Sequence, residues 1–246
     1  MSQLKDSYPQ YYMSKNKIEL TEDLDLDLLL KMIKGKYDTY PCNTVDGLKI
    51  DFASGIRSMM RQDPDIILVG EIRDSDTATM ALRAAMTGHQ VFSTLHTNSA
   101  LGALARLLDL GLNPEILAGN MIGVIAQRLV RRLCRSCRKP YQPNSAQRRL
   151  LGLDPAGTQP LYEAGSCDDC EQQGYFGRVA LMEIVRFDAD LDELVARRAT
   201  LREMRSLVAQ KGARSLAQDA VRRVIDGTTT LSEIARSIDL TSLEPQ

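Results

Sequence analysis

The sequence predicts an α/β fold, and three neighbouring segments carry that prediction. Residues 65–71 read Asp-Ile-Ile-Leu-Val-Gly-Glu, a short β-branched apolar run that ends in an acid, as in a central parallel strand buried on both faces. Residues 77–86 are alanine-rich and helix-prone, and Gly88 follows as a C-cap. Residues 91–95, Val-Phe-Ser-Thr-Leu, are strand-like again. We therefore expect two strands joined by a helix.

The length and composition are those of an ordinary globular protein. The chain has 246 residues, 43% hydrophobic and 26% charged, which suggests one or two domains at about 100–200 residues each. A chain of this length buries a core without disulfides. Its net charge of −1 gives no general attraction to nucleic acid or to anionic membranes.

The sequence also lacks the usual membrane signals. No stretch of 18 apolar residues occurs, so no transmembrane helix and no direct membrane insertion are expected. The first six residues, Met-Ser-Gln-Leu-Lys-Asp, are not followed by the apolar core of a signal peptide. We expect a cytoplasmic protein whose cysteines are reduced or metal-bound.

The basic residues change type near residue 50. Seven of the nine lysines lie at or before Lys49, whereas all 22 arginines lie at or after Arg57. Arginine and lysine are largely exchangeable on a solvated face, so a single domain gives no reason for this switch. We interpret residues 49–57 as a junction between segments of different origin; a chance fluctuation in a short lysine-rich domain is the alternative.

The segment before the junction predicts a small α+β piece. Residues 17–20 are strand-like, residues 24–33 helix-prone, and Asp46-Gly47 is a hairpin signal. Residues 11–17 (Tyr-Tyr-Met-Ser-Lys-Asn-Lys) and 43–49 (Asn-Thr-Val-Asp-Gly-Leu-Lys) resemble the last domain of the α-D-phosphohexomutases. The resemblance covers about residues 4–52. It stops before that family's phosphate-gripping loop, so we expect a remnant without mutase activity.

Glu71 ends the first predicted strand. In open α/β sheets, ligands bind beyond the carboxyl ends of the strands. A carboxylate placed there can orient Mg²⁺ or polarise an attacking water during phosphoryl transfer. A surface acid in a turn is the alternative on this feature alone.

The sequence around Glu71 resembles a known family. Residues 61–74 read Arg-Gln-Asp-Pro-Asp-Ile-Ile-Leu-Val-Gly-Glu-Ile-Arg-Asp, and residues 87–99 read Thr-Gly-His-Gln-Val-Phe-Ser-Thr-Leu-His-Thr-Asn-Ser. These resemble the Walker B and His boxes of the ATPases that drive type II secretion and type IV pilus assembly (GspE/PilB-like). The resemblance covers about residues 53–240, including 127–134 (Gln-Arg-Leu-Val-Arg-Arg-Leu-Cys) and 177–180 (Gly-Arg-Val-Ala).

That resemblance implies a RecA-like P-loop NTPase sheet and roles for several residues. Glu71 would activate water, and His96 would face the γ-phosphate of ATP bound with Mg²⁺. His89 is either a nucleotide-site residue or a structural histidine. Three arginines could contact phosphates or another subunit. They could equally be solvated or paired with Asp63 and Asp74. These arginines are Arg57, Arg61 and Arg73.

The phosphate-binding half of such an ATPase is missing from this sequence. The loop G-x-x-x-x-G-K-[ST] holds the β- and γ-phosphates through its backbone amides and lysine. Gly35-Lys36 is the only Gly-Lys pair, but Tyr37 follows it and Leu30 replaces the first glycine. The chain therefore resembles a truncated family member. We expect it to bind ATP poorly and to hydrolyse it negligibly by itself, although the family as a whole hydrolyses ATP.

Four cysteines form a candidate metal site. Cys134 and Cys137 form one C-x₂-C pair and Cys167 and Cys170 a second, with 29 residues between the pairs. Two such pairs hold a structural Zn²⁺ in a closed tetrahedron. Free thiols and disulfides are the alternatives, disulfides being disfavoured in a cytosolic chain. Many members of the resembled family carry a tetracysteine subdomain here. The arginines expected to offset the charge of this site are Arg131, Arg132, Arg135 and Arg138.

The remaining sequence is predicted to be mostly helical. Residues 101–110 and 114–133 continue a helical pattern, and residues 145–151 predict a short helix inside the metal subdomain. Capping boxes at Thr200 to Glu203 and at Thr230 to Glu233 predict two further helix starts.

Four domains follow from these features. They are a phosphohexomutase-like α+β segment (1–52), a partial RecA-like ATPase core (53–133), a tetracysteine zinc subdomain (134–178) and a C-terminal helical region (179–246).

The family resemblance implies a motor that couples ATP hydrolysis to protein secretion or pilus extrusion. Its partners would be further copies of the chain, a hexamer in the family, and an inner-membrane platform protein that holds it peripherally at the membrane. Residues 128–139 are basic but lack interleaved aromatics, so we expect no nucleic-acid partner. The alternatives are a non-enzymatic zinc-containing interaction module or pseudo-ATPase, and a fusion product without a selected function.

Overall fold

The computed structural model describes residues 52–62 and 64–240, which divide between two compact units. In its described part, unit 1 comprises residues 52–96, Ala105–Gly123 and Arg186–Ala199, and unit 2 comprises Thr97–Leu104, Val124–Val185 and residues 200–240. The phosphohexomutase-like segment, apart from Phe52, lies outside the described residues, as do Cys42 and Asp63.

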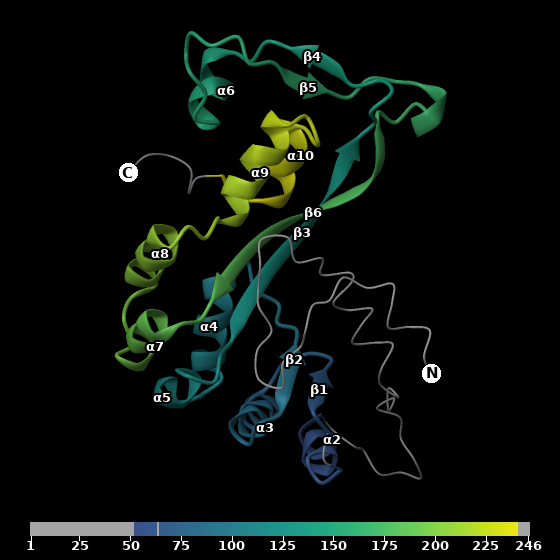
Figure 1. Cartoon of the computed structure of the whole chain (residues 1–246). Helices are drawn as coiled ribbons and strands as arrows, with labels where there is room; N and C mark the ends of the chain where they lie inside the picture. Colours follow the sequence, from purple (N-terminus) through teal and green to yellow (C-terminus); the bar gives the residue numbers. More distant parts are fainter. Residues whose placement is uncertain (1–51, 63, 241–246) are drawn as a thin grey trace, which may run out of the picture. The chain divides into compact units, whose positions relative to one another are not determined.

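Unit 1 contains the predicted strand, helix and strand (Figure 1). Helix α2 (Phe52–Met59) precedes strand β1 (Ile66–Val69), and helix α3 (Ser75–Met86) leads to strand β2 (Gln90–Ser93). The strands pair in parallel, from Ile66 opposite Gln90 to Val69 opposite Ser93. Asp74 caps α3 by accepting a 2.8 Å hydrogen bond from the Thr77 amide, and Gly88, at φ +95°, follows its end. The prediction of a parallel pair with a helical connection is thus confirmed.

The core of unit 1 lies on one face of this sheet. Ile67 and Val69 are buried with Ile56 of α2 and with Met80 and Ala84 of α3. Successive side chains of a strand point to opposite faces, so both helices cover the same face. Leu68 lies on the opposite face of the sheet and is 38% exposed. The prediction that β1 is buried on both faces is therefore wrong for the residues that the structure describes.

Three more helices complete the description of this part of the chain. Helix α4 (Ala100–Asp109) begins in unit 2 and ends in unit 1. Helices α5 (Pro114–Leu117) and α7 (Ala189–Ala196) both belong to unit 1 and pack against each other.

Unit 2 is organised by two long paired strands, β3 (Gly123–Leu133) and β6 (Tyr175–Arg186) (Figure 1). The Cys134 amide donates to the Gly174 carbonyl (3.0 Å), and at the other end the Phe187 amide donates to the Ile122 carbonyl (3.0 Å). The end of one strand therefore pairs with the start of the other, and the two run antiparallel.

The predicted helix over residues 114–133 is wrong after Leu117. Gly119, at φ +79°, follows α5, and residues 123–133 form β3 instead. Helix propensity is a weak prior that tertiary context overrides, and here the context is the ladder with β6, more than forty residues away in sequence. The region predicted as C-terminal helices also begins with a strand, because residues 179–186 belong to β6.

A small lobe lies between these strands in sequence. It contains β4 (Lys139–Tyr141), antiparallel to β5 (Leu161–Glu163), with helix α6 (Ser145–Leu150) between them and the 3₁₀ turn η1 (Asp168–Cys170) after them. The short helix predicted at residues 145–151 is confirmed. The buried Arg148 side chain closes the loop by donating to the Asp154 carbonyl (3.1 Å) and to Gln142 Oε1 (3.1 Å).

Helices α8 (Leu201–Gln210), α9 (Leu216–Ile225) and α10 (Leu231–Ser237) end the described chain. The capping box predicted at α8 is confirmed, since Thr200 and Glu203 bond reciprocally. At α10 only half of the box forms. Thr230 accepts from the Glu233 amide, but the Glu233 carboxylate binds Arg131 of β3 instead, with 2.6 Å between Oε2 and a guanidinium nitrogen.

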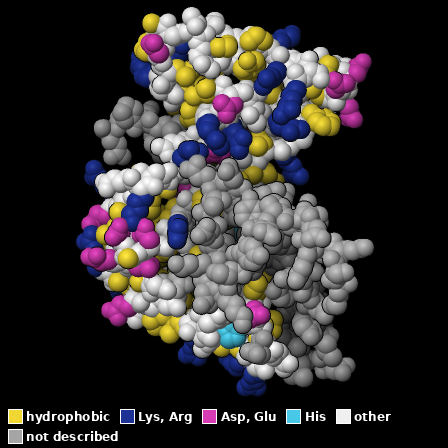
Figure 2. Space-filling model, viewed as in Figure 1, with side chains coloured by type: hydrophobic (Ala, Val, Ile, Leu, Met, Phe, Trp, Pro, Cys, Tyr) yellow, Lys and Arg dark blue, Asp and Glu magenta, His cyan; other side chains and the backbone are white. Residues whose placement is uncertain are grey.

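The described surface mixes residue types. On the face shown in Figure 2, Lys and Arg side chains occur in several separate groups among polar and apolar ones. The large apolar side chains that remain exposed are Phe52, Leu68, Met86, Ile122, Leu129 and Phe176. None of the described helices combines the length and apolar character needed to cross a membrane.

The Glu233–Arg131 pair predicts a pH-dependent contribution to stability. The hydrogen bond from Arg131 lowers the pKa of Glu233, although burial opposes it. The stabilisation is therefore complete above the unfolded-state pKa of about 4.3 and is lost as the pH falls through the folded-state pKa.

We expect Glu233→Gln to reduce the free energy of unfolding by about 1–3 kcal/mol at pH 7, the value of a hydrogen bond to a charged group. Urea unfolding of both proteins at pH 7 and near pH 3 measures the difference, which should shrink at the lower pH. An equal difference at both pH values would contradict the assignment.

Candidate functional site

Glu71 and His96 come together at one edge of the parallel sheet. Both lie just beyond the carboxyl ends of β1 and β2, which meet at the same edge because the strands are parallel. The pairing continues past the strands: the Ile72 amide donates to the Thr94 carbonyl (3.0 Å), and Thr94 Oγ1 donates to the Gly70 carbonyl (2.7 Å). As a result, His96 Nε2 lies 3.3 Å from Glu71 Oε2.

The two carboxylate oxygens of Glu71 have different surroundings. Oε1 is paired with the Arg73 guanidinium at 2.5 Å. Oε2 is buried and makes no hydrogen bond within the described residues, His96 being close without hydrogen-bonding geometry. The Glu71 side chain is only 20% exposed, whereas His96 is 86% and Arg73 73% exposed. The site therefore pairs a sheltered acceptor oxygen with two exposed groups able to contact an anion.

His89 lies at the opposite end of β2. Its Nδ1 is 3.0 Å from the Ala84 carbonyl and 3.0 Å from Thr87 Oγ1, so its ring binds the C-terminus of α3. The structure does not bring His89 to the Glu71–His96 pair.

The three candidate arginines differ in their surroundings. Arg73 pairs with Glu71 and not with Asp74, whose carboxylate caps α3. An Arg57 guanidinium nitrogen lies 4.0 Å from Met80 Sδ, and Arg61 is exposed in the turn after α2. Of the three, only Arg73 is joined to Glu71.

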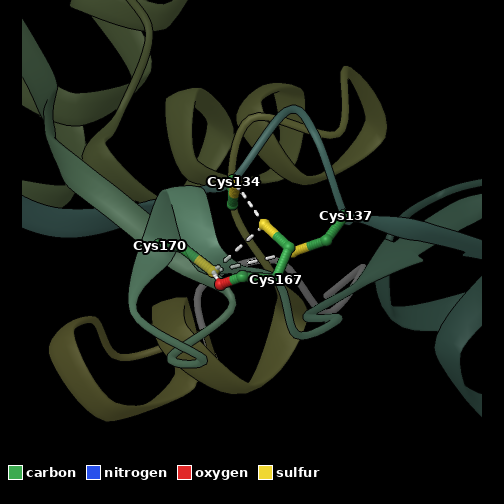
Figure 3. Close-up of side chains that lie close together, drawn as sticks. All are labelled: Cys134, Cys137, Cys167 and Cys170. Atoms are coloured by element: carbon green, nitrogen blue, oxygen red, sulfur yellow. Dashed lines mark hydrogen bonds between the residues drawn. The ribbon is translucent and has the colours of Figure 1, made fainter.

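The four cysteines converge on one point in unit 2 (Figure 3). Their sulfurs all lie within 4.8 Å of one another. The Sγ–Sγ distances are 3.8 Å for Cys134–Cys167, 3.7 Å for Cys137–Cys170 and 3.6 Å for Cys167–Cys170. A tetrahedral Zn²⁺ with bonds of about 2.3 Å requires sulfurs about 3.8 Å apart. The donor set and its spacing thus fit zinc, and all four cysteines are free of disulfides.

Close backbone approaches hold the cysteines in place. Gly174, at φ +73°, donates its amide to Cys170 Sγ (3.2 Å), and a Cβ at this position would lie 2.5 Å from the Gly165 carbonyl oxygen. A Cβ on Gly165 would collide with the Cys137 carbonyl. Neither glycine was predicted from the sequence. Their positions were a usable signal, since Gly165 lies two residues before Cys167 and Gly174 four residues after Cys170.

Crowding of the thiols perturbs their ionisation. Burial and hydrogen bonds from the neighbouring cysteines raise the pKa of Cys137 to about 12. Burial also acts to raise the pKa of Cys170, but backbone hydrogen bonds at Cys167 and Gly174 oppose it and bring it to about 7.

Two of the four arginines expected to offset the charge of this site, Arg131 and Arg138, have other partners. Arg131 binds Glu233 and lies 4.2 Å from the centre of the Tyr175 ring. Arg138 donates to the Gly227 carbonyl (2.6 Å) and lies 4.5 Å from the centre of the Tyr162 ring. These side chains anchor the ends of β3 and of the lobe rather than the sulfurs.

Comparison with known proteins shows the family to which the chain is similar. Residues 42–236 match the family model "Type II/IV secretion system protein"; the match begins inside the phosphohexomutase-like segment. The chain is 46% identical over 190 residues to "Type II secretion system protein E" of Pseudomonas aeruginosa, covering 76% of the chain and 38% of that protein. It is 41% identical over 214 residues to "Type IV pilus assembly ATPase TfpB" of Acinetobacter baylyi, covering 86% and 36%.

Solved structures show the same likeness. The pilus retraction motor PilT with bound ADP superposes with a TM-score of 0.53 at 26% identity, covering 80% of this chain and 45% of that one. The ATPase DotB of Legionella pneumophila superposes with a TM-score of 0.52 at 25% identity, covering 76% and 42%. The chain thus spans less than half the length of the proteins that it matches. The solved structures that it resembles are RecA-like secretion ATPases, and its α/β fold superposes on part of them. The chain belongs to the type II/IV secretion system protein family, whose members include secretion and pilus-assembly motor ATPases.

Proposed function

We propose that this chain carries the water-activating and metal-binding parts of a secretion or pilus-assembly motor ATPase. The observation that supports it best is the pairing of Glu71 with His96 beyond the ends of two parallel strands, with one sheltered Glu71 oxygen lacking a hydrogen-bonded partner in the described residues. This is the position where α/β proteins bind their ligands.

The chemistry of such a site follows from its charges. ATP, bound with Mg²⁺, supplies the phosphoryl group. Glu71 Oε2 accepts a hydrogen bond from the attacking water and orients it, while Arg73 pairs with Oε1. His96 and Arg73, both exposed, donate to the phosphate charge that develops in the transition state. The other candidate residues would take part only by contacting another subunit or the bound nucleotide. They are His89, Arg57 and Arg61.

ATP binding is the weak step in this proposal. The 246 residues contain no G-x-x-x-x-G-K-[ST] loop, which removes most of the ground-state contacts to the phosphates. The chain by itself should therefore bind Mg-ATP poorly. As the family resemblance implies, the working motor would be a cytoplasmic oligomer, a hexamer, acting on an inner-membrane platform protein.

Zinc is proposed for the second site. Cys134, Cys137, Cys167 and Cys170 would hold a structural Zn²⁺ that supplies no open coordination position. The metal would fix the turn after β3 to the turn before β6, in agreement with the proposed division into a partial ATPase core (53–133), a zinc subdomain (134–178) and a helical region (179–246).

One observation favours a non-enzymatic interaction module as the second candidate. The cysteine cluster belongs entirely to unit 2, whereas Glu71 and His96 belong to unit 1. Zinc binding in unit 2 therefore does not require a competent nucleotide site, and zinc retained without any nucleotide binding would support the module.

The hydrolytic role of Glu71 can be tested with a chimera. We would join a phosphate-loop segment of a full-length family member ahead of residue 53. The chimera should hydrolyse ATP, and Glu71→Gln should lower its kcat by about 10²–10⁴-fold, the usual contribution of a general base.

Exposed Glu115 of unit 1 provides the matched control, since Glu115→Gln should leave the rate unchanged. If the Glu71→Gln chimera hydrolysed ATP as fast as the unsubstituted chimera, the role assigned to Glu71 would be wrong. Calorimetric titration of the 246-residue chain with Mg-ATP should show weak binding, and rapid turnover by that chain alone would contradict the proposed weakness.

The zinc site can be tested through Gly174. We expect Gly174→Ala to lower zinc affinity at least tenfold, because its new Cβ would meet the Gly165 carbonyl and its φ of +73° is strained for alanine. Gly152→Ala is the control, since Gly152 has a similar φ of +64° but nothing within 4 Å of a Cβ. Metal content by mass spectrometry and competition with a chromogenic chelator measure both; equal affinities would show that the close approach is unimportant.

A further inference from the structure

The turn between α9 and α10 (residues 227–230) is hydrogen-bonded to the end of β3. The Leu133 amide donates to the Thr228 carbonyl (2.9 Å), and Thr229 Oγ1 donates to the Arg131 carbonyl (2.8 Å). The Thr229 side chain is fully buried. These residues all belong to unit 2, and Leu133 directly precedes the first cysteine of the metal site. The turn is therefore fixed to the strand that leads into the site.

The same turn is held from the other side of the first cysteine pair. Arg138 directly follows Cys137 and donates to the Gly227 carbonyl (2.6 Å). Its guanidinium lies 4.5 Å from the centre of the Tyr162 ring on β5. The Arg138 amide also donates to the Cys134 carbonyl (3.1 Å), which closes the loop between the two cysteines. The first pair is thus flanked on both sides by residues that hydrogen-bond to the α9–α10 turn.

The contact with Arg138 requires glycine at position 227. Gly227 has a φ of +68°, in the left-handed region that favours glycine. A Cβ there would lie 2.9 Å from the Arg138 guanidinium nitrogen that donates to Gly227, and it would also collide with the Tyr162 ring. Gly212, in the turn after α8, has a similar φ of +86°, but nothing lies within 4 Å of a Cβ at that position. Close approach therefore distinguishes Gly227 from Gly212.

The turn is also connected to the second cysteine pair. Tyr175 Oη lies 3.0 Å from Thr230 Oγ1. Tyr175 follows Gly174, whose carbonyl accepts from the Cys134 amide (3.0 Å) and whose amide donates to Cys170 Sγ (3.2 Å). Contacts from the turn therefore reach the backbone that carries cysteines of both pairs.

We propose that the α9–α10 turn positions the cysteine site, so that zinc binding and the packing of the turn stabilise each other. Its residues are positioning residues, since they act through the backbone on either side of the cysteines. Two coupled equilibria change each other by the same factor. Weakening the turn therefore weakens zinc binding, and removing zinc loosens the turn. The inference rests on the proposed zinc site and is independent of the nucleotide site.

The first test compares Arg138→Lys with Arg135→Lys in the 246-residue chain. Exposed Arg135 lies inside the first C-x₂-C loop, so both substitutions keep a positive charge near the sulfurs. Lysine at 138 loses the planar guanidinium that contacts Gly227 and Tyr162. Arg138→Lys should lower zinc affinity by about five- to tenfold, at the lower end of the usual coupling between sites, in competition with a chromogenic chelator. Arg135→Lys should leave the affinity unchanged.

Gly227→Ala tests the other partner of the same contact, with Gly212→Ala as its control. Both substitutions place alanine at a strained positive φ, but only the Cβ at 227 meets other atoms. Gly227→Ala should lower zinc affinity by about tenfold or more, and Gly212→Ala should not change it. If Gly227→Ala fails to fold, Arg138→Lys alone decides. Equal zinc affinities of Arg138→Lys and the unsubstituted chain would overturn the coupling.

Hydrogen exchange measures the reverse effect. Removing zinc with a chelator should speed exchange of the amides of residues 228–237 by about tenfold, while the amides of α7 in unit 1 should exchange as before. Exchange in residues 228–237 that does not respond to zinc would contradict the proposal. An unsubstituted chain that bound no zinc would overturn the proposed zinc site together with the coupling, whereas equally tight zinc binding by all variants would overturn the coupling alone.

Discussion

The antiparallel pairing of β3 with β6 is the interaction on which most of unit 2 depends. At one end, the Cys134–Gly174 hydrogen bond joins the two turns that carry the cysteine pairs. Along the strands, Glu233 reaches both the backbone amide and the side chain of Arg131, and Asp219 accepts from the Met182 amide, so α9 and α10 are attached to the ladder by buried carboxylates. The ladder thus joins the two cysteine-bearing turns and supplies the partners of Glu233 and Asp219 on β3 and β6.

A shorter pairing plays the same part in unit 1. The parallel register of β1 and β2 continues through Ile72 and Thr94, and this alone brings Glu71 within 3.3 Å of His96. The two residues are 25 positions apart in sequence, but strand register fixes their separation in space. Apolar packing on one face of the sheet holds that register, through Ile67 and Val69 against α2 and α3.

Sequence reasoning succeeded where the signal was local. The β1 run, the helix predicted over residues 77–86 and the two C-x₂-C pairs are each encoded within a few residues, and the structure contains all of them. It failed where a distant partner decides the outcome. Residues 123–133 have a composition compatible with a helix, and only the pairing with residues 175–186 makes them a strand.

The same reason explains the polar contacts that the sequence could not reveal. Glu233 fits a capping box by its spacing from Thr230, yet an arginine 102 positions away binds its carboxylate. Arg128 was part of a basic string with no visible role, and its acceptors lie about thirty positions earlier. A local spacing motif is thus a poor guide to the partner of a charged residue when the fold brings a stronger partner close. An arginine–carboxylate pair outweighs a single capping hydrogen bond.

The geometry of Glu71 and His96 depends on backbone pairing and apolar packing inside unit 1, none of which involves a phosphate-binding loop. The arrangement that would orient water can therefore persist in a sequence that lacks the residues needed to hold a nucleotide. If Glu71 and His96 have the proposed roles, turnover would also require contacts to the phosphates of the kind that a G-x-x-x-x-G-K-[ST] loop supplies, and this sequence contains no such loop. On this proposal, nucleotide binding and water activation come from separate segments, so the role of Glu71 can be tested while a phosphate-binding segment is supplied from outside.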